Sequence, residues 1–287
     1  MKTKQYLDIT RSEKPSLFIV GVVRNVSQTL ELEVQTILTS VSDFQIVNWF
    51  LVESDSDDET LNVLKRLSNK YRNFKYVSLG NLRREIPLRT ARLAVCRNKY
   101  MEYLDNNISG NELIMVADLD GANLDLSKES IRSISSRSDW SVVCANQRHA
   151  YFDIWALRHE TWCTGDWIAE YRKFTIDQKL SPQKALKRAL YSKMRHIPSG
   201  DDWIPVRSAF GGLAIYKAAC IKGLRYEGLN EKHEEICEHV RFNESITSKG
   251  FSMFIVPSLI NCNMSTHTQI LRNSIKFKTF IKRILFG

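Results

Sequence analysis

Hydrophobic residues in this sequence gather in short runs that alternate with segments of helical spacing. Residues 16–23 are apolar at nearly every position, which is typical of a parallel strand covered on both faces. Residues 45–52 repeat this character, and residues 61–71 have the spacing of an amphipathic helix. The same criteria predict a helix at 90–104 and further strands at 74–79, 113–117, 141–146 and 252–257. Strands that alternate with helices predict an α/β fold with a mostly parallel central sheet flanked by helices.

The sequence contains no internal repeat and no low-complexity linker, so we expect a single compact unit of two abutting halves. The boundary is expected shortly after Leu124, which gives an N-terminal half at 1–124 and a C-terminal half at 125–268. Within the second half, residues 162–203 are basic, irregular and helical in character. Residues 269–287 form a separate tail.

Charge limits the kinds of partner. Lys and Arg outnumber Asp and Glu by 41 to 32, a formal net charge of +9 that favours anionic ligands such as nucleotide diphosphates or anionic lipid. No nucleic-acid recognition signature is present, so we expect no nucleic-acid partner.

Six scattered cysteines without a C-x-x-C pair predict reduced core thiols. With no signal-peptide pattern and no apolar stretch near the roughly twenty residues that span a bilayer, a cytoplasmic location is expected.

Two carboxylates follow directly on a predicted strand. Asp118 and Asp120 end the apolar run 113–117, where ligands of open α/β sheets bind. Oxygen ligands of this kind suit Mn²⁺ or Mg²⁺. Unit charges about 4 Å apart interact by roughly 4 kcal/mol at an effective dielectric of about 20, enough for such a cation to stabilise a leaving diphosphate. Taken alone, D-x-D is more often a solvated acidic turn, but its place after a buried strand favours a site.

The order of these motifs resembles a known family. Val22-Val23-Arg24-Asn25, the segment 52–57, the helix through Arg97-Asn98, and Asp118-Leu119-Asp120 together resemble the nucleotide half of GT-A glycosyltransferases. The segments 151–158, 210–216 and 237–240 are similar to capsule-associated α-1,3-mannosyltransferases and related bacterial surface-glycan transferases. The resemblance covers roughly residues 16–267 and implies a GT-A-like fold, with a nucleotide-sugar-binding half followed by an acceptor-binding and catalytic half.

The resemblance also implies roles in the first half. Glu53 would hydrogen-bond the nucleoside, and Arg97 would lie near the donor pocket. The structural alternatives are a solvated turn acid and a helix-surface arginine. Arg24 would meet a phosphate or pair with the acidic loop 55–59.

In the second half, Gly211 and Gly212 would let the backbone approach a sugar, or would form a plain turn. Glu238 falls where many inverting GT-A enzymes carry a catalytic base in a Glu-Asp pair. The second member of the pair here is His239, which leaves both the base and the stereochemical course open.

Asp153 is the rival catalytic carboxylate, because Trp155 beside it suits a sugar ring. His267 falls where GT-A enzymes often supply a late third metal ligand, although a lone loop histidine is more often only exposed.

The C-terminal tail has the outline of a basic amphipathic helix, with five cations among its apolar residues: Arg272, Lys276, Lys278, Lys282 and Arg283. At about 1 kcal/mol per cation near an anionic leaflet, this segment would attract the chain to a membrane surface. Packing on the body of the protein is the alternative.

Together these features predict a metal-dependent hexosyltransferase. It would move a sugar from a nucleotide-sugar donor to a glycan or lipid-linked acceptor in surface polysaccharide synthesis, such as that of lipopolysaccharide, at the inner face of the membrane. The alternatives are a nucleotidyltransferase of similar fold, whose glycine-rich phosphate loop is missing after the first strand, and a non-catalytic glycan-binding protein on a membrane.

Overall fold

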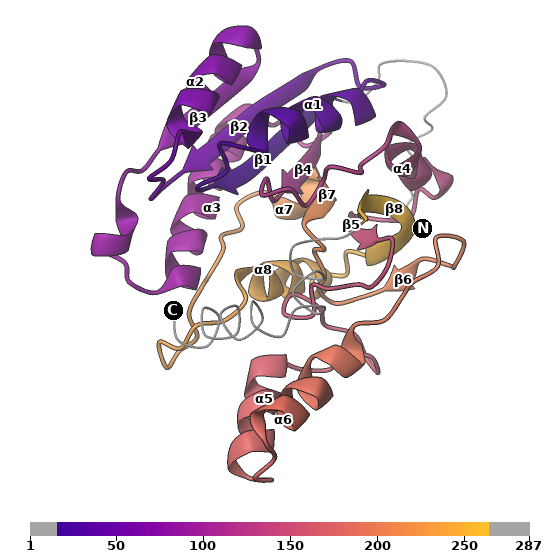
Figure 1. Cartoon of the computed structure of the whole chain (residues 1–287). Helices are drawn as coiled ribbons and strands as arrows, with labels where there is room; N and C mark the ends of the chain where they lie inside the picture. Colours follow the sequence, from indigo (N-terminus) through magenta and orange to yellow (C-terminus); the bar gives the residue numbers. More distant parts are fainter. Residues whose placement is uncertain (1–15, 264–287) are drawn as a thin grey trace.

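The structure is a computed structural model and describes residues 16–263 (Figure 1). His267 and the tail at 269–287 therefore lie outside the described residues, and the predictions made for them stay predictions. Within residues 16–263, no helix combines the length and the apolar character needed to span a bilayer.

The strands form one sheet in the order β3-β2-β1-β4-β7-β5-β8-β6. The neighbours β1/β2, β1/β4, β2/β3 and β5/β8 are parallel, whereas β7 is antiparallel to both β4 and β5, and β6 is antiparallel to β8. The strand bounds are Leu17–Val23 (β1), Val47–Glu53 (β2), Phe74–Ser78 (β3), Leu113–Ala117 (β4), Val142–Gln147 (β5), Ile204–Pro205 (β6), Leu213–Lys217 (β7) and Met253–Cys262 (β8).

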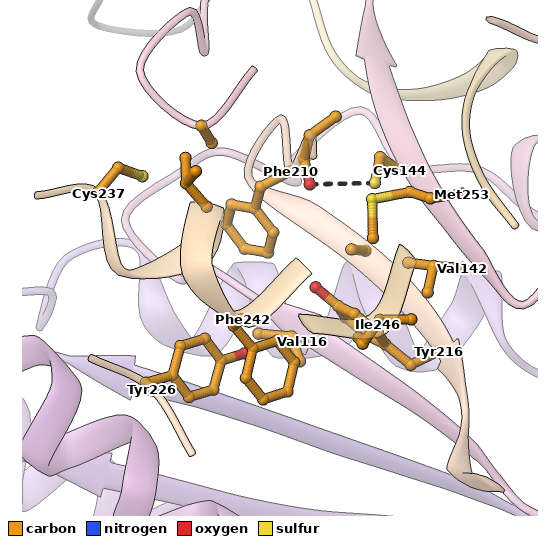
Figure 2. Packing of buried hydrophobic residues seen from close by; sticks show 14 of the residues in the cluster. Val116, Val142, Cys144, Phe210, Tyr216, Tyr226, Cys237, Phe242, Ile246 and Met253 are labelled. Carbon is orange, nitrogen blue, oxygen red and sulfur yellow. Dashed lines mark hydrogen bonds between the residues drawn. The ribbon is translucent and has the colours of Figure 1, made fainter. Parts of the chain in front are cut away.

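Helices cover both faces of this sheet, which is why the central strands β1 and β4 are apolar throughout. Leu17 and Ile19 of β1 pack in a core with residues of α1, α2 and α4, whereas Phe18 and Val20 pack in a second core with residues of α3, α7 and α8. Figure 2 shows part of the second core, where Phe210, Tyr216, Tyr226 and Phe242 gather. The α-helix bounds are Leu30–Ser40 (α1), Thr60–Lys70 (α2), Arg89–Asn107 (α3), Lys128–Arg132 (α4), Trp167–Ile176 (α5), Pro182–Ala189 (α6), Ala218–Ile221 (α7) and Glu238–Thr247 (α8).

The expected α/β fold and the strands of the first half are confirmed. The segment expected to be helical and irregular holds α5 and α6, which project from the rest of the molecule as a pair (Figure 1). All six cysteines are buried and free, as predicted for core thiols.

Candidate active site

Strand ends from both halves meet at one edge of the sheet. In the parallel ladders, Val23 at the end of β1 lies opposite Glu53 at the end of β2, which lies opposite Ser78 of β3. On the other side of β1, Ala117 at the end of β4 pairs with Leu213 at the start of the antiparallel β7. This register places the predicted site residues Arg24, Glu53, Asp118, Gly211 and Gly212 along one edge.

The acidic pair leaves the sheet immediately after β4. The Asp118 amide donates a hydrogen bond to the Gly212 carbonyl at 3.0 Å, which extends the β4/β7 ladder by one residue. Leu119 points into the core at 1% exposure, so the chain presents Asp118 and Asp120 outward on either side of it. The Asp118 side chain is 37% exposed and Asp120 is exposed.

Arg97 connects this pair to the second half. It lies on α3 with only 3% exposure, so the alternative of a helix-surface arginine is wrong. Its Nε donates to Glu238 Oε1 at 3.0 Å, its Nη2 to Asp118 Oδ1 at 3.3 Å and its Nη1 to the Tyr100 hydroxyl at 3.3 Å. The guanidinium also lies 5.7 Å from the centre of the Phe210 ring. A buried cation held this way fixes two carboxylates that are distant in sequence.

Negative charge exceeds positive charge around Asp118. Burial raises the pKa of Asp118, Arg97 opposes the shift, and the charges of Asp120, Asp153 and Glu238 raise it further. Carboxylates that repel one another at a partly exposed strand end are suited to a divalent cation, which relieves the repulsion. Within residues 16–263, no three His, Cys, Asp or Glu side chains form a ready-made metal cluster. Two carboxylates supply only part of the oxygen ligands of a divalent cation, so a cation bound at Asp118 and Asp120 would need further ligands from outside the described residues.

Asp153 and Glu238 differ in accessibility. Asp153 is partly buried, and its Oδ2 accepts a hydrogen bond from the Gly211 amide at 2.9 Å. Burial raises the pKa of Asp153, and the Gly211 and Ala156 amides oppose the shift. Glu238 is the first residue of α8 and only 4% exposed, so a surface helix acid is excluded. Its charge is satisfied by Arg97 and by the helix N-terminus.

Both glycines have positive φ angles and lie tightly against neighbouring parts of the protein. Gly211 has φ +71°, and a Cβ there would lie 2.6 Å from the Ala145 carbonyl oxygen of β5. Gly212 has φ +82°, and a Cβ there would lie 3.1 Å from Ala122 Cβ. The close approach that these glycines permit in the structure is therefore to neighbouring protein, and contact with a sugar stays a prediction.

His239 stands where the Glu-Asp pair would have its aspartate, and its buried surroundings do not suit a proton acceptor. Its ring is 4% exposed and stacks on Phe210 at 3.9 Å between centroids. Neither ring nitrogen has a hydrogen-bond partner among residues 16–263. Burial and the nearby Arg97 charge lower the pKa of His239 well below its ordinary value.

Glu53 and Arg24 both contact the loop that follows β2. Glu53 is 1% exposed, so it is not a solvated turn acid; it accepts hydrogen bonds from the Ser56 amide at 2.9 Å and from the Ser78 hydroxyl. Arg24 Nε donates to the Asp55 carbonyl at 3.2 Å, a contact with the acidic loop named as one of its two alternatives. Binding of a nucleoside or phosphate by either residue remains a prediction.

Sequence reasoning missed a buried polar network behind the acidic pair. Glu33 of α1 is fully buried and accepts hydrogen bonds from the Gly121 and Asn123 amides, both at 2.8 Å. Asn123 Nδ2 donates to the Asp118 carbonyl, and its Oδ1 accepts from Asn261 Nδ2 at 3.1 Å. A signal was present, because Glu33 falls on the apolar face made by the α1 residues Leu30, Val34 and Ile37.

Among solved structures, the chain is similar to the mannosyltransferase PcManGT from Pyrobaculum calidifontis in complex with GDP-Man and Mn²⁺. The TM-score is 0.54 at 13% identity, over 96% of this chain and 66% of that one. The fold is GT-A-like. The chain thus spans slightly less than two thirds of that protein.

Two weaker likenesses are to S. aureus TarS 1–349 and to glucosyl-3-phosphoglycerate synthase from Mycobacterium tuberculosis in complex with Mn²⁺, UDP and phosphoglyceric acid. For TarS the TM-score is 0.47 at 12% identity, over 87% of this chain and 60% of that one. For the synthase the TM-score is 0.43 at 10% identity, over 87% and 67%. No protein-family model matches the sequence, and no curated protein sequence matches it.

Proposed function

We propose that the chain is a metal-dependent glycosyltransferase that moves a hexose from a nucleotide-sugar donor to a glycan or lipid-linked acceptor. The observation that carries the proposal is the position of Asp118 and Asp120. In a GT-A-like fold they leave the carboxyl end of β4 at the edge where β1 and β2 also end. The structurally similar mannosyltransferase was solved with GDP-Man and Mn²⁺, which makes GDP-mannose with Mn²⁺ the first combination to test.

In this proposal, Asp118 and Asp120 hold Mn²⁺ or Mg²⁺, and the bound cation supplies charge neutralisation for the departing nucleoside diphosphate. Arg97 keeps the Asp118 carboxylate in one orientation through the 3.3 Å contact. Arg24 and Glu53 lie at the ends of β1 and β2, near the end of β4, and would bind the phosphate and the nucleoside of the donor. His267 remains a proposed third ligand outside the described residues.

An inverting transfer also needs a group that accepts the proton of the acceptor hydroxyl. The sequence points to Glu238 and Asp153, and burial distinguishes them. Asp153 is the more accessible and has no ion-pair partner within residues 16–263, whereas Glu238 is 4% exposed and bound to Arg97. We therefore assign proton acceptance to Asp153 and orientation of Arg97 to Glu238.

The proposed setting is surface polysaccharide synthesis at the inner face of the membrane, with the basic tail at 269–287 as the contact with anionic lipid. Only the amino-acid sequence of the tail supports this part of the proposal.

The decisive experiment measures hydrolysis of a panel of nucleotide sugars, with GDP-mannose first, in Mn²⁺ and in EDTA. The expected result is slow hydrolysis of one donor in Mn²⁺, lost in EDTA and in Asp118→Asn. Calorimetry with GDP and UDP accompanies it. A glycan-binding protein would show no Mn²⁺-linked nucleotide affinity, and a nucleotidyltransferase would release pyrophosphate from a nucleoside triphosphate; either result overturns the proposal.

A further inference from the structure

The Asp120 carboxylate is not held by any side chain of the described chain. Within residues 16–263 it accepts no hydrogen bond and forms no ion pair, and it is exposed. Asp118 differs, because Arg97 binds its carboxylate and Gly212 binds its amide. The position of Asp120 therefore depends on the backbone on both sides of it, and buried Leu119 anchors the side that precedes it.

The backbone that follows Asp120 is anchored by the buried side chain of Glu33 on α1. Glu33 Oε2 accepts from the Gly121 amide at 2.8 Å, and Glu33 Oε1 accepts from the Asn123 amide at 2.8 Å and from Asn123 Nδ2 at 3.1 Å. Every hydrogen bond that Glu33 makes through its side chain thus goes to the two residues at 121 and 123.

Asn123 connects these hydrogen bonds to the backbone of Asp118. Its Nδ2 also donates to the Asp118 carbonyl at 2.5 Å, and its Oδ1 accepts from Asn261 of β8. The loop from Asp118 to Asn123 is consequently closed on itself and anchored to α1 and β8. Gly121 adopts φ +96° inside this closed loop, which lets the chain turn between the two anchored amides.

A fully buried carboxylate is costly, and a helix as apolar as α1 would pack equally well around an apolar side chain at this position. An acceptor with two oxygens can, however, bind two amides and a side-chain amide at once, which no apolar residue can do. We infer that Glu33 is a positioning residue for the cation: it holds the backbone of 121–123 so that Asp120 is presented beside Asp118. This inference rests on the proposed function.

Glu33→Gln tests it directly, because glutamine keeps the size but replaces one acceptor oxygen with a donor that opposes an amide N–H. The matched control is Glu31→Gln on the same helix, whose carboxylate is 42% exposed and lies 3.4 Å from Lys70 Nζ. In the metal-free protein, hydrogen exchange of the peptide containing Gly121 and Asn123 should accelerate in Glu33→Gln only. Residues that support metal ligands typically contribute a factor of about 10 to 100 in metal affinity, and Mn²⁺-linked binding of GDP or UDP in calorimetry should fall by that factor.

A purely structural role would accelerate exchange and lower thermal stability but leave Mn²⁺-linked binding at the wild-type value. A folded Glu33→Gln variant with wild-type Mn²⁺-linked binding therefore overturns the inference, whatever its exchange rate. If Glu33→Gln does not fold, Glu33→Asp decides, because it keeps the charge but shortens the side chain by one methylene, which withdraws both oxygens from the Gly121 and Asn123 amides. Unchanged Mn²⁺-linked binding in that variant also overturns the inference. Absence of such binding in the wild-type protein instead overturns the proposed function, and the inference with it.

Discussion

Replacing Glu33 by glutamine should change how the stability of the protein depends on pH. Burial raises the pKa of Glu33 from 4.5 to about 7 in the folded protein, while the Gly121 and Asn123 hydrogen bonds oppose the shift and the charge of Asp120 adds to it. The folded state therefore binds this proton more tightly than the unfolded state. Between pH 4.5 and about 7, the unfolded chain loses the proton first, so the free energy of unfolding falls as pH rises.

The size of the effect follows from the shift. Each pKa unit corresponds to about 1.4 kcal/mol, so ionised Glu33 destabilises the folded protein by about 3 kcal/mol above pH 7 relative to pH 4. The Glu33→Gln variant has no proton to release at this position, and its lost hydrogen bond adds an offset that does not depend on pH. The difference in unfolding free energy between variant and wild type should therefore move in favour of the variant by up to about 3 kcal/mol as pH rises.

Urea unfolding at pH 5, 6, 7 and 8 in EDTA measures this difference, with Glu31→Gln, the same substitution at a half-exposed position of α1, as the matched control. Groups that titrate equally in all three proteins cancel in the comparison. Parallel profiles for wild type and Glu33→Gln would refute the reasoning, because they would show that Glu33 has the same pKa in the folded and unfolded states.

Four further results are expected. Asp120→Asn should remove Mn²⁺-linked nucleotide affinity while the unfolding midpoint stays at the wild-type value, since the side chain is exposed; wild-type affinity in calorimetry would contradict this. Asp153→Asn should lower kcat by about 10² to 10⁴ with donor affinity retained, and an equal loss confined to Glu238→Gln in the same steady-state assay would move the base to Glu238. Arg97→Met should cost about 3 to 5 kcal/mol in urea unfolding, because it strands buried Glu238 without its cation, and a loss below 1 kcal/mol would count against the ion-pair account. Deleting residues 270–287 should abolish sedimentation with anionic vesicles and spare turnover of a soluble acceptor, whereas unfolding of the truncated protein would show that the tail packs on its body.

The first half of the fold was accessible to sequence reasoning because its signals are local. The runs that became β1, β2 and β4 are apolar on both faces, and parallel strands joined by helices leave few arrangements. The antiparallel direction of β7 could not be predicted from the sequence. Its run 213–217 reads as a strand, but its insertion between β4 and β5 is decided by pairing with residues far away in the chain.

The site residues also divide into those that a local sequence signal indicates and those whose environment depends on distant residues. Asp118 and Asp120 could be proposed as cation ligands because they follow a recognisable strand, and this role stays a prediction. Burial of Arg97 and Glu238 was not foreseen, because a charged residue on a helix reads as exposed unless its partner is known, and each of these is the partner of the other. Glu33 was missed for a similar reason. Its hydrogen bonds go to backbone amides about 90 residues away, and a sequence does not show which backbone amides a side chain will bind.

The antiparallel strand β7 makes the two halves of the chain inseparable. β7 belongs to the C-terminal half by sequence, yet its backbone satisfies the hydrogen bonds of β4 at the sheet's centre. A fragment ending near residue 124 would leave an open, apolar strand edge of the kind that aggregates. Exchange of the second half with that of another protein would have to reproduce the pairing of Ala117 with Leu213, so recombination at this boundary is disfavoured.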